Sequence, residues 1–505
     1  MKKSFNLVDQ KWIPCLFMNG SSRECSLLEL FSGSHMIRTL NSDLPVEKIA
    51  LYRFFLAILH RNFGPNSTSE WQQSWEYGKF DEKVLSAYFS KWYSHFDLFD
   101  DTHPFYQTPN IDTETRPLLG YSFYLALYHL ASGNNATLFD HHTQESDFAI
   151  NYSQAARLLV TAQSFAFGFR TLKDGPSARG INFILLGDSL FHTFLLNMVR
   201  YDQSTPFQIL NKDLPAWEQE DPFSPERTKP DGYLDYLTWQ SRKILLHPEK
   251  DKGEIRFVQV DNGLKLGVTE EPYTKNPMMA YSIVEKPARN QSPYRLLKFQ
   301  EGRALWRDST AVMETTSNKQ FAPLAVNWVQ DCNIHLENIR LNSIGISSDQ
   351  GKVNYYLEEL FSFPAIYLEK ELLVADLKTC LLNAESVRQK LWGAINKIAE
   401  VMLSPESDKD GGRQPDKKDK QNLIDHIFAE DQYWVWLEPP FYQLLHDLPK
   451  KEQESMEFWN KVLQNSAWKA FEFAREYIGS SPVALKAGAQ ASRILRAGLK
   501  KVFGE

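Results

Sequence analysis

The 505-residue chain is poor in cysteine, with only Cys15, Cys25, Cys332 and Cys380. No two of them have the C-x-x-C spacing of a local zinc knuckle. Such sparse and scattered cysteines are typical of a protein from a reducing compartment rather than of a secreted disulfide framework. We therefore expect no structural zinc, and the sequence points to no cofactor.

The sequence also predicts no leader peptide and contains no long apolar run. Its first residues, MKKSFNLVDQKW, carry two lysines but no hydrophobic core of a signal peptide. The most apolar stretch, residues 181–199, is interrupted by Asp188 and His192. This interruption predicts a buried strand or helix rather than a membrane span, so we expect a cytoplasmic protein with no membrane partner.

An excess of positive charge is absent too, because 56 Lys and Arg face 63 Asp and Glu, for a net charge of -7. A surface that is basic throughout is excluded, and contact with nucleic acid has to come from local patches. Aromatic residues are plentiful, with 33 Phe, 21 Tyr and 13 Trp. Aromatic side chains fill large cores and also stack on nucleic-acid bases.

The apolar patterning predicts an α+β fold in two parts. The chain opens like a β-hairpin with NGSS as its turn, and residues 45–63 then have helical apolar spacing behind Pro45. Strand-like and loop-rich segments continue to about residue 365. Helical patterns then dominate, at 373–403, 421–430, 453–478 and 481–503. We predict a large mixed domain at 1–365 and a C-terminal four-helix bundle at 366–505.

Residues 345–352, GISSDQGK, look at first like the phosphate loop of a nucleotide hydrolase. Five residues separate Gly345 from Gly351 where the pattern has four, and Val353 stands where a Ser or Thr should follow Lys352. A phosphate loop also follows a buried strand and opens a helix, whereas the preceding HLENIRLNS is too polar to predict a buried strand. A nucleotide hydrolase therefore remains only a weakly supported alternative to an ordinary turn.

The segment 134–146, NNATLFDHHTQES, contains Asp140, His141 and His142, all suitable metal ligands. Adjacent side chains diverge on a strand or a helix, so the neighbouring histidines cannot easily hold one ion. The alternatives are a structured loop packed by Phe139 and its neighbours, a metal-dependent nuclease, and a loop that contacts phosphates, sugars and bases.

Two further segments carry cations. Residues 168–180, GFRTLKDGPSARG, combine three glycines with three cations, a composition that suits close approach of a backbone to phosphate but also an ordinary surface loop. In the last predicted helix, Lys486, Arg493 and Lys500 follow one another at steps of seven, with Arg496 beside them. Steps of seven lie on one stripe of a helix, which can follow a DNA backbone or simply face solvent.

Taken together, several segments resemble the CasA family, the large subunit of the type I-E CRISPR surveillance complex called Cascade. The resemblance covers most of the chain and depends on the order and spacing of moderately specific motifs. They are FNLVDQKWIP at 5–14, HPFYQTP at 103–109, NNATLFDHH at 134–142, LLGDSLFHTFLLNMV at 185–199, NPMMAY at 276–281, GRALWRD at 302–308 and GISSDQGKV at 345–353.

The resemblance implies a non-enzymatic subunit that recognises the protospacer-adjacent motif (PAM) in double-stranded DNA and starts strand separation and R-loop formation. It also implies that the subunit helps to recruit the helicase–nuclease. The implied partners are the crRNA, the target DNA, and the backbone, 5′-handle-binding and small subunits of the ribonucleoprotein. Pairing with the guide reads the target sequence, as in other RNA-guided effectors.

The resemblance also implies roles for particular residues. The family's glutamine wedge matches Gln350, with Asp349 beside it, and its minor-groove lysine finger falls on Lys265 or Lys275. The family's glycine loop matches the stretch that starts at Gly168.

The family's loop that contacts DNA and RNA matches 134–146, including Asn135 and Phe139. Phe169 and Arg170 stand where some members have a glycine cluster, which leaves the PAM preference open. The cysteine-rich zinc module of some members is missing here.

Overall fold

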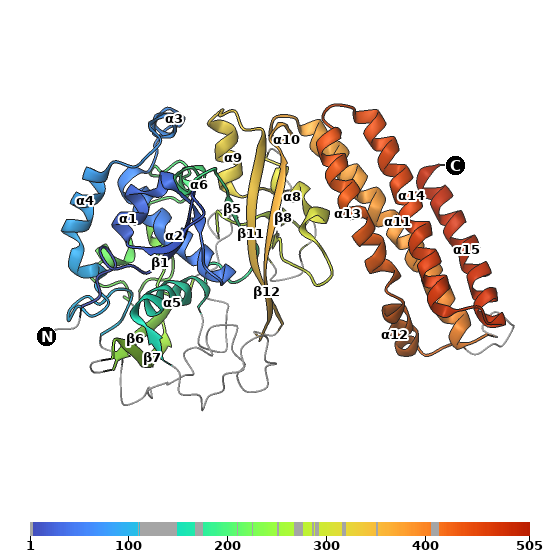
Figure 1. Ribbon diagram of the computed structural model, residues 1–505, viewed down its shortest axis with the longest axis horizontal. Helices are drawn as coiled ribbons and strands as arrows, with labels where there is room; N and C mark the ends of the chain where they lie inside the picture. Colours follow the sequence, from blue (N-terminus) through green and yellow to red (C-terminus); the bar gives the residue numbers. More distant parts are fainter. Residues whose placement is uncertain are drawn as a thin grey trace. The chain divides into compact units, whose positions relative to one another are not determined.

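In the computed structural model the chain divides into two compact units, described separately below (Figure 1). The first comprises Met1–Leu305 and Ala311–Ser362, and the second comprises Trp306–Thr310 and Phe363–Glu505. The structure describes residues 4–109, 111, 149–166, 175–209, 211–224, 226–249, 252–266, 276–284, 287, 292–315, 320–349, 352–405 and 414–504.

The first unit mixes helices with small antiparallel sheets. Its elements begin with β1 (Ile13–Phe17), β2 (Ser22–Cys25), α1 (Leu27–Ser32), η1 (Ser34–Met36), β3 (Ile37–Leu40), α2 (Pro45–Phe63), α3 (Thr68–Tyr77), α4 (Glu82–Lys91), η2 (Tyr93–Phe96), β4 (Ile150–Asn151), α5 (Tyr152–Phe165), β5 (Asn182–Leu185) and α6 (Leu190–Asn197). They continue with η5 (Ala216–Glu218), α7 (Tyr233–Leu237), β6 (Arg242–Pro248), β7 (Glu254–Asn262), β8 (Tyr281–Ile283), β9 (Tyr294–Leu296), α8 (Thr310–Met313), β10 (Gln320–Phe321), α9 (Leu324–Asp331), β11 (Asn338–Asp349) and β12 (Lys352–Pro364). Between β9 and α8 lies η6 (Leu305–Asp308), which belongs to the second unit from Trp306 on.

The opening of the chain follows the sequence prediction. β1 and β2 form the expected antiparallel hairpin, and β3 adds to it in the order β2-β1-β3. The predicted helix at 45–63 is α2, which is buried around nearly its whole circumference. A helix that is apolar on all sides belongs to a core, and α2 accordingly occupies the centre of the first unit.

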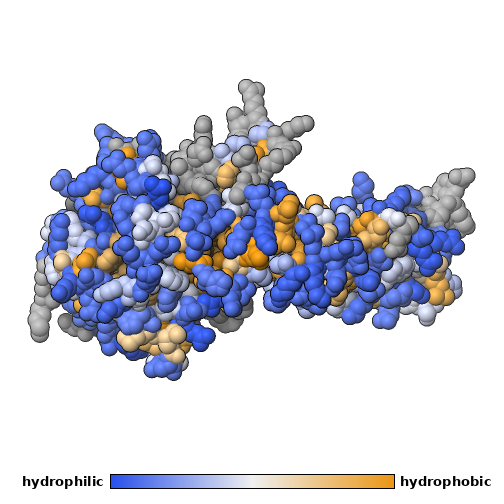
Figure 2. Space-filling view, turned by 90° about the horizontal axis from the view of Figure 1, so that it is seen from above, coloured by the Kyte–Doolittle hydropathy of each residue, from blue (hydrophilic) through white to orange (hydrophobic). Residues whose placement is uncertain are grey.

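The apolar stretch at 181–199 forms the buried strand β5 and the buried helix α6, as predicted. In the part of the chain that the structure describes, no helix combines the length and apolar character needed to cross a bilayer. On the face of the molecule drawn in Figure 2, hydrophilic residues cover most of the surface and hydrophobic residues form small groups among them.

The expectation that residues before Gly345 form no buried strand is wrong. β11 pairs with β5, with Ile344 opposite Asn182 and Leu341 opposite Leu185. Ile339 and Leu341 are buried while Asn338 and Arg340 are exposed, so one face of the strand is buried at its start. From Leu341 to Ile346 every residue is buried, including the polar Asn342 and Ser343, so both faces are covered although the segment is mostly polar.

The second unit is a helical bundle. Its elements are α10 (Ile366–Glu369), α11 (Glu371–Leu403), α12 (Lys417–Ile427), α13 (Ala429–Asp447), α14 (Glu452–Ile478) and α15 (Pro482–Phe503). The four long helices pack side by side, with α11 in contact with α13, α14 and α15 (Figure 1). The α+β fold class with a C-terminal four-helix bundle is therefore confirmed, while the domain limits 1–365 and 366–505 stay a prediction.

One helix of the bundle differs from the prediction. The expected helix at 421–430 is only the short α12, and the full-length helix is α13, which the sequence pattern missed because Pro439 and Pro440 lie inside it. Each internal proline removes a helix hydrogen bond and costs about 3 kcal/mol. Tertiary packing offsets this cost, since Leu437 and Phe441 on either side of the prolines are fully buried.

A short segment from the middle of the chain completes the bundle core. Trp306 is 1% exposed, and its ring lies 4.6 Å from that of Phe441 and 5.8 Å from that of Trp434. The Arg307 guanidinium lies 3.5 Å over the Trp434 ring and donates to Glu385 at 2.7 Å. The motif GRALWRD therefore supplies a buried anchor to helices that follow it by more than sixty residues.

The last helix packs mainly through small side chains. Its large apolar residues Leu485 and Ile494 are 57% and 41% exposed. The buried side is made of small residues together with two leucines, namely Ala484, Ala487, Gly488, Ala491, Leu495 and Leu499. Such small side chains let α15 approach its neighbours closely.

The two glycines of α15 predict opposite effects of one substitution. A Cβ at Gly488 would meet only the Nε and outer carbons of the Arg475 side chain, at 3.2 Å or more, and that side chain can move. A Cβ at Gly498 would lie 2.8 Å from the Cβ of Lys390, which is fixed to the backbone of α11. We expect Gly488→Ala to stabilise α15 by up to about 1 kcal/mol through helix propensity, and Gly498→Ala to bring no gain or a loss.

Hydrogen-exchange protection of the α15 amides in the full chain measures both effects. Equal gains in the two variants would show that the close contact at Lys390 does not constrain the helix.

Candidate nucleic-acid interface

The structure describes only part of the predicted contact set. Outside the described residues lie Asn135, Phe139, Gly168, Arg170, Lys275 and Gln350, together with Asp140, His141 and His142 of the alternative metal site. Within them lie Lys265, the backbone of Asp349, and the four cations Lys486, Arg493, Arg496 and Lys500. The segments that carry the undescribed residues can still be followed up to their flanks.

Gln350 is carried by a long two-stranded ribbon. β11 ends at Asp349 and β12 begins at Lys352, so two residues connect twelve- and thirteen-residue strands that lie side by side (Figure 1). A phosphate loop needs a helix after its glycines, whereas a strand follows here. This geometry rules out a phosphate loop at 345–352, and with it the basis for a nucleotide hydrolase.

Gly345 has a packing role within this ribbon. A Cβ at this position would lie 3.0 Å from the Phe299 ring and 3.3 Å from the carbonyl oxygen of Gly180. Such distances are tighter than ordinary side-chain contacts, so the glycine allows β11 to lie directly against neighbouring segments. The glycine that suggested a nucleotide site instead holds the ribbon close to the end of the 168–180 segment.

Two buried asparagines connect the predicted contact segments, and the sequence analysis missed both. Asn182 on β5 is fully buried and donates from Nδ2 to the Ser177 carbonyl at 3.0 Å, with longer contacts of 3.5 Å to the carbonyls of Gly180 and Ile344. Asn276, at the start of NPMMAY, is 1% exposed and donates to Asn182 Oδ1 at 3.2 Å.

The Asn276 side chain satisfies its remaining groups locally. It donates to the Pro176 carbonyl at 2.9 Å, and its Oδ1 accepts from the Met278 amide at 2.9 Å. The two amides therefore join the end of the 168–180 segment, the NPMMAY motif and β11. The sequence offered one signal for Asn276. It is a polar residue within a family motif, and a polar residue that is buried is nearly always hydrogen-bonded.

The described flanks of the segment that contains Gly168 and Arg170 lie together. A Cβ at Gly175 would come within 2.4 Å of the Phe165 backbone, and the Ser177 amide donates to the Ser164 carbonyl at 3.0 Å. Arg242, 1% exposed, donates to the Ala166 carbonyl at 2.6 Å. The described residues on either side of this segment, Ala166 and Gly175, thus lie close together.

Lys265 is exposed, and the residues before it are anchored to a neighbouring segment. The Gly263 and Leu264 amides donate to the carbonyls of Ser241 and Gln240 at 3.1 Å and 2.9 Å. Leu264 is buried at 6% exposure, which fixes the backbone next to the lysine. The ammonium of Lys265 is therefore presented to solvent from a firm base.

The four cations of α15 lie on the side of the helix opposite its alanine face, and all four are exposed. Lys486 Nζ donates to the Pro405 carbonyl at 2.8 Å. For Arg493, Arg496 and Lys500, the described part of the chain offers no acid within salt-bridge distance. The predicted stripe therefore exists on this surface, although Lys486 is partly engaged.

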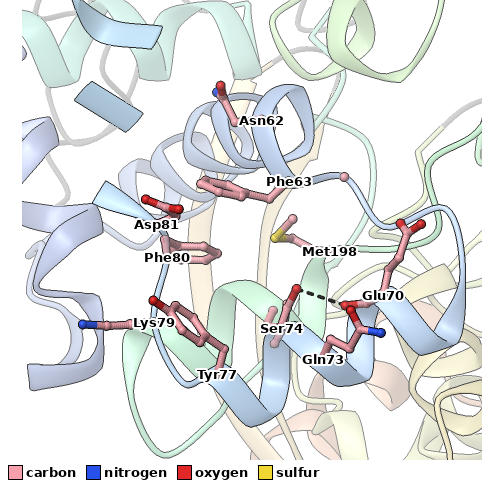
Figure 3. A pocket seen from close by; sticks show the side chains of 12 residues that line it. Asn62, Phe63, Glu70, Gln73, Ser74, Tyr77, Lys79, Phe80, Asp81 and Met198 are labelled. Carbon is pink, nitrogen blue, oxygen red and sulfur yellow. Dashed lines mark hydrogen bonds between the residues drawn. The ribbon is translucent and has the colours of Figure 1, made fainter. Parts of the chain in front are cut away.

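A hollow of about 560 Å³ between α2, α3 and α6 does not belong to this interface. Figure 3 shows Phe63, Phe80 and Met198 around it, with the carboxylates of Glu70 and Asp81 on opposite sides. None of the predicted contact residues lines it. Two carboxylates at its edges repel a phosphate, so we do not assign this hollow to nucleic acid.

The four cysteines are buried thiols. Burial raises the pKa of Cys332 and of Cys380 to about 12, which favours the protonated thiol near neutral pH. Within the described residues no three His, Cys, Asp or Glu side chains gather closely enough to hold a metal ion. Asp140, His141 and His142 of the alternative site lie outside the described residues.

Known proteins match the chain over nearly its full length. The CRISPR-associated protein CasA/Cse1 of Thermus thermophilus (strain ATCC 27634 / DSM 579) is 30% identical, over 97% of this chain and 96% of that protein. The crystal structure of a Thermus thermophilus CasA matches with a TM-score of 0.81 at 25% identity, over 99% of this chain and 100% of that one.

A chain of a structure described as a CRISPR RNA-guided surveillance complex shares the fold, with a TM-score of 0.76 at 19% identity over 97% of this chain and 99% of that one. The family described as CRISPR-associated protein Cse1 matches residues 6–470. The resemblance seen in the sequence motifs is thereby confirmed, and the chain belongs to the CRISPR-associated Cse1 (CasA) family.

Proposed function

We propose that the chain is the large, non-catalytic subunit of a type I-E RNA-guided surveillance complex, Cascade. In this role it recognises the PAM in double-stranded DNA, begins strand separation and helps to recruit the helicase–nuclease. Family membership supports the proposal, as does the shared fold with a chain of an RNA-guided surveillance complex. Its partners are then the crRNA, the target DNA and the other Cascade subunits.

The ribbon formed by β11 and β12 is the observation that carries this proposal. A wedge that opens a base step has to resist the force it exerts, because unstacking costs a few kcal/mol per step. β11 is paired with β5 over Leu341–Ile344 and is buried there, so the ribbon that leads toward Gln350 starts from the core of the first unit. Gln350 follows directly after β11 in the sequence, and its amide can hydrogen-bond to a base whose partner has been displaced.

The residues predicted to contact the PAM are close in sequence to segments that are hydrogen-bonded to β11. The 168–180 segment and the NPMMAY motif are tied to β11 through Asn182 and Asn276. In the sequence, Gly168 and Arg170 precede Pro176 and Ser177 of this network, and Lys275 directly precedes Asn276. Asn135 and Phe139 belong to the segment assigned to DNA and RNA contact. A lysine finger, Lys265 or Lys275, would read the minor groove beside the wedge.

The bundle supplies a second contact surface in this proposal. Arg493, Arg496 and Lys500, with Lys486, form an exposed cationic stripe along α15. Such a stripe can follow a phosphate backbone without reading its sequence. No observation on the described residues favours the alternative of a metal-dependent nuclease using Asp140, His141 and His142.

The wedge is tested by Gln350→Ala in assembled complex. A side chain at the end of a ribbon contributes little to a core, so we expect normal folding. If the amide offsets about 1 kcal/mol of the opening cost, R-loop formation on fully paired target falls roughly fivefold. Target that is already unpaired beside the PAM should show little change. Equal loss on both targets in a strand-opening assay would contradict the wedge assignment.

The lysine finger is tested by comparing Lys265→Ala with Lys275→Ala on duplexes with and without the PAM. Minor-groove readout is degenerate, so loss of the finger should reduce PAM discrimination while most non-specific binding remains. Lys252→Ala is a matched control, because Lys252 is an exposed lysine in the turn between β6 and β7. If neither variant alters discrimination, the lysine finger lies elsewhere.

The stripe is tested by replacing Lys486, Arg493, Arg496 and Lys500 together with Ala. We expect lower DNA affinity regardless of PAM sequence and a flatter salt dependence, by up to about 0.9 log units for each lost phosphate contact. Replacing Lys417, Lys418 and Lys420 of α12 by Ala gives a control with a similar change in bundle charge. A folded quadruple variant with the original salt slope would show that the stripe is only a solvated face.

A further inference from the structure

A second hollow, of about 200 Å³, lies in the bundle where α12 ends and α13 begins, against α11. Trp392 and Ile395 of α11 and Ile424 of α12 form its apolar walls, and Phe428, between α12 and α13, lines it as well. None of the residues predicted to contact DNA lines this hollow. Its volume is below that of usual sites for small ligands and is suited to one long side chain.

The two aromatic side chains of this hollow are partly exposed. Trp392 is 42% exposed and Phe428 is 56% exposed. Phe428 has φ +52°, in the left-handed region that favours glycine. Its neighbours Ile427 and Ala429 are buried at 0% and 1% exposure, so the backbone is anchored on both sides while the ring stays outside. Packing within the chain therefore does not account for an aromatic residue here.

The edge of the hollow is acidic, with Asp425, Glu430 and Asp431 among the residues that line it. Arg388 already pairs with Glu430 at 3.1 Å, whereas Asp425 accepts a hydrogen bond from the neutral amide of Gln421 at 2.7 Å. Neither Asp425 nor Asp431 has a cation within salt-bridge distance in the part of the chain that the structure describes. Acidic side chains in the first turn of a helix interact favourably with the positive end of its dipole, which accounts for Glu430 and Asp431 in α13. This interaction does not account for Asp425 or for the exposed rings.

We propose that this hollow, which we call the Trp392–Phe428 site, binds an arginine side chain from a basic segment of a protein partner. A guanidinium is flat and weakly hydrated, stacks on aromatic faces and binds carboxylates through paired N–H groups. The aromatic rings meet the first requirement, and the carboxylates of Asp425 and Asp431 meet the second. The same acids repel the phosphates of nucleic acid. The proposal is independent of the DNA contacts assigned above.

The experiment uses the full chain labelled with 5-fluorotryptophan and followed by fluorine NMR, with the Trp392 resonance assigned from Trp392→Phe. The probes are three peptides: acetyl-Gly-Arg-Gly-amide, and its two analogues in which lysine or norleucine replaces arginine. We expect a saturable shift of the Trp392 resonance with the arginine peptide, weaker binding of the lysine peptide and none of the norleucine peptide. Added salt should weaken binding of the arginine peptide, because the contact is partly ionic.

Variants separate the site from general effects. Phe428→Gly removes the ring while fitting the left-handed backbone, so the fold is kept, and we expect roughly two- to fivefold weaker binding of the arginine peptide. Asp425→Asn combined with Asp431→Asn should weaken it as well. Leu382→Ala, which truncates another exposed residue of α11, is the matched control and should bind as the unmodified chain does.

Three results would overturn the proposal. The first is equal binding of the arginine, lysine and norleucine peptides. The second is unchanged arginine binding in both the Phe428 and the aspartate variants. The third is a shift of the Trp392 resonance with a single-stranded oligonucleotide but not with the arginine peptide, which would assign the site to nucleic acid.

Discussion

The hydrogen bond between the buried side chains of Asn182 and Asn276 is the contact on which the arrangement of the first unit depends. Through these two amides, three segments that are far apart in the sequence meet at one point: the end of 168–180, the NPMMAY motif and β11. A buried amide left without partners costs about 1–3 kcal/mol. Asn276 donates to Asn182, and backbone groups of Ser177, Pro176 and Met278 satisfy the rest of the two amides. Displacing one segment therefore leaves polar groups of the others unpaired, and the three positions are coupled.

This coupling explains how long polar segments can be presented from a fixed base. β11 is buried and paired with β5 from Leu341 to Ile344, and its last described residue, Asp349, directly precedes Gln350 in the sequence. Gly345 allows β11 to pack closely, because a side chain at this position would press against Phe299 and move the ribbon away from it. The proposed contacts with a duplex therefore start from backbone that the fold holds in place.

Packing in the bundle depends instead on small residues and on one residue distant in the sequence, Trp306. Alanines and glycines on α15 permit close approach to its neighbours, and Trp306 from the middle of the chain fills the space beside Phe441. The large apolar side chains of α15 that seemed suited to the core, Leu485 and Ile494, are left exposed. Close packing of the small face leaves the cationic side of the helix free of the core, which makes a continuous charged stripe available.

The sequence by itself determined the features that depend on local pattern and on family motifs. The hairpin at the N-terminus, the helix at 45–63, the bundle class and membership of the Cse1 family could all be predicted, because periodicity and motif order need no knowledge of distant contacts. The cationic stripe was also predictable, since spacing by seven residues places side chains on one side of any helix.

Only the tertiary structure decided the rest. The two prolines of α13 concealed a helix that buried neighbours such as Leu437 and Phe441 hold together, and the polar composition of β11 concealed a strand whose pairing with β5 is non-local. The partners of Asn182, Asn276 and Trp306 could not be predicted from the sequence, because a hydrogen bond or a ring contact across a hundred residues has no counterpart in local spacing. Those long-range contacts, rather than residue type, determine where the described flanks of the predicted contact segments lie.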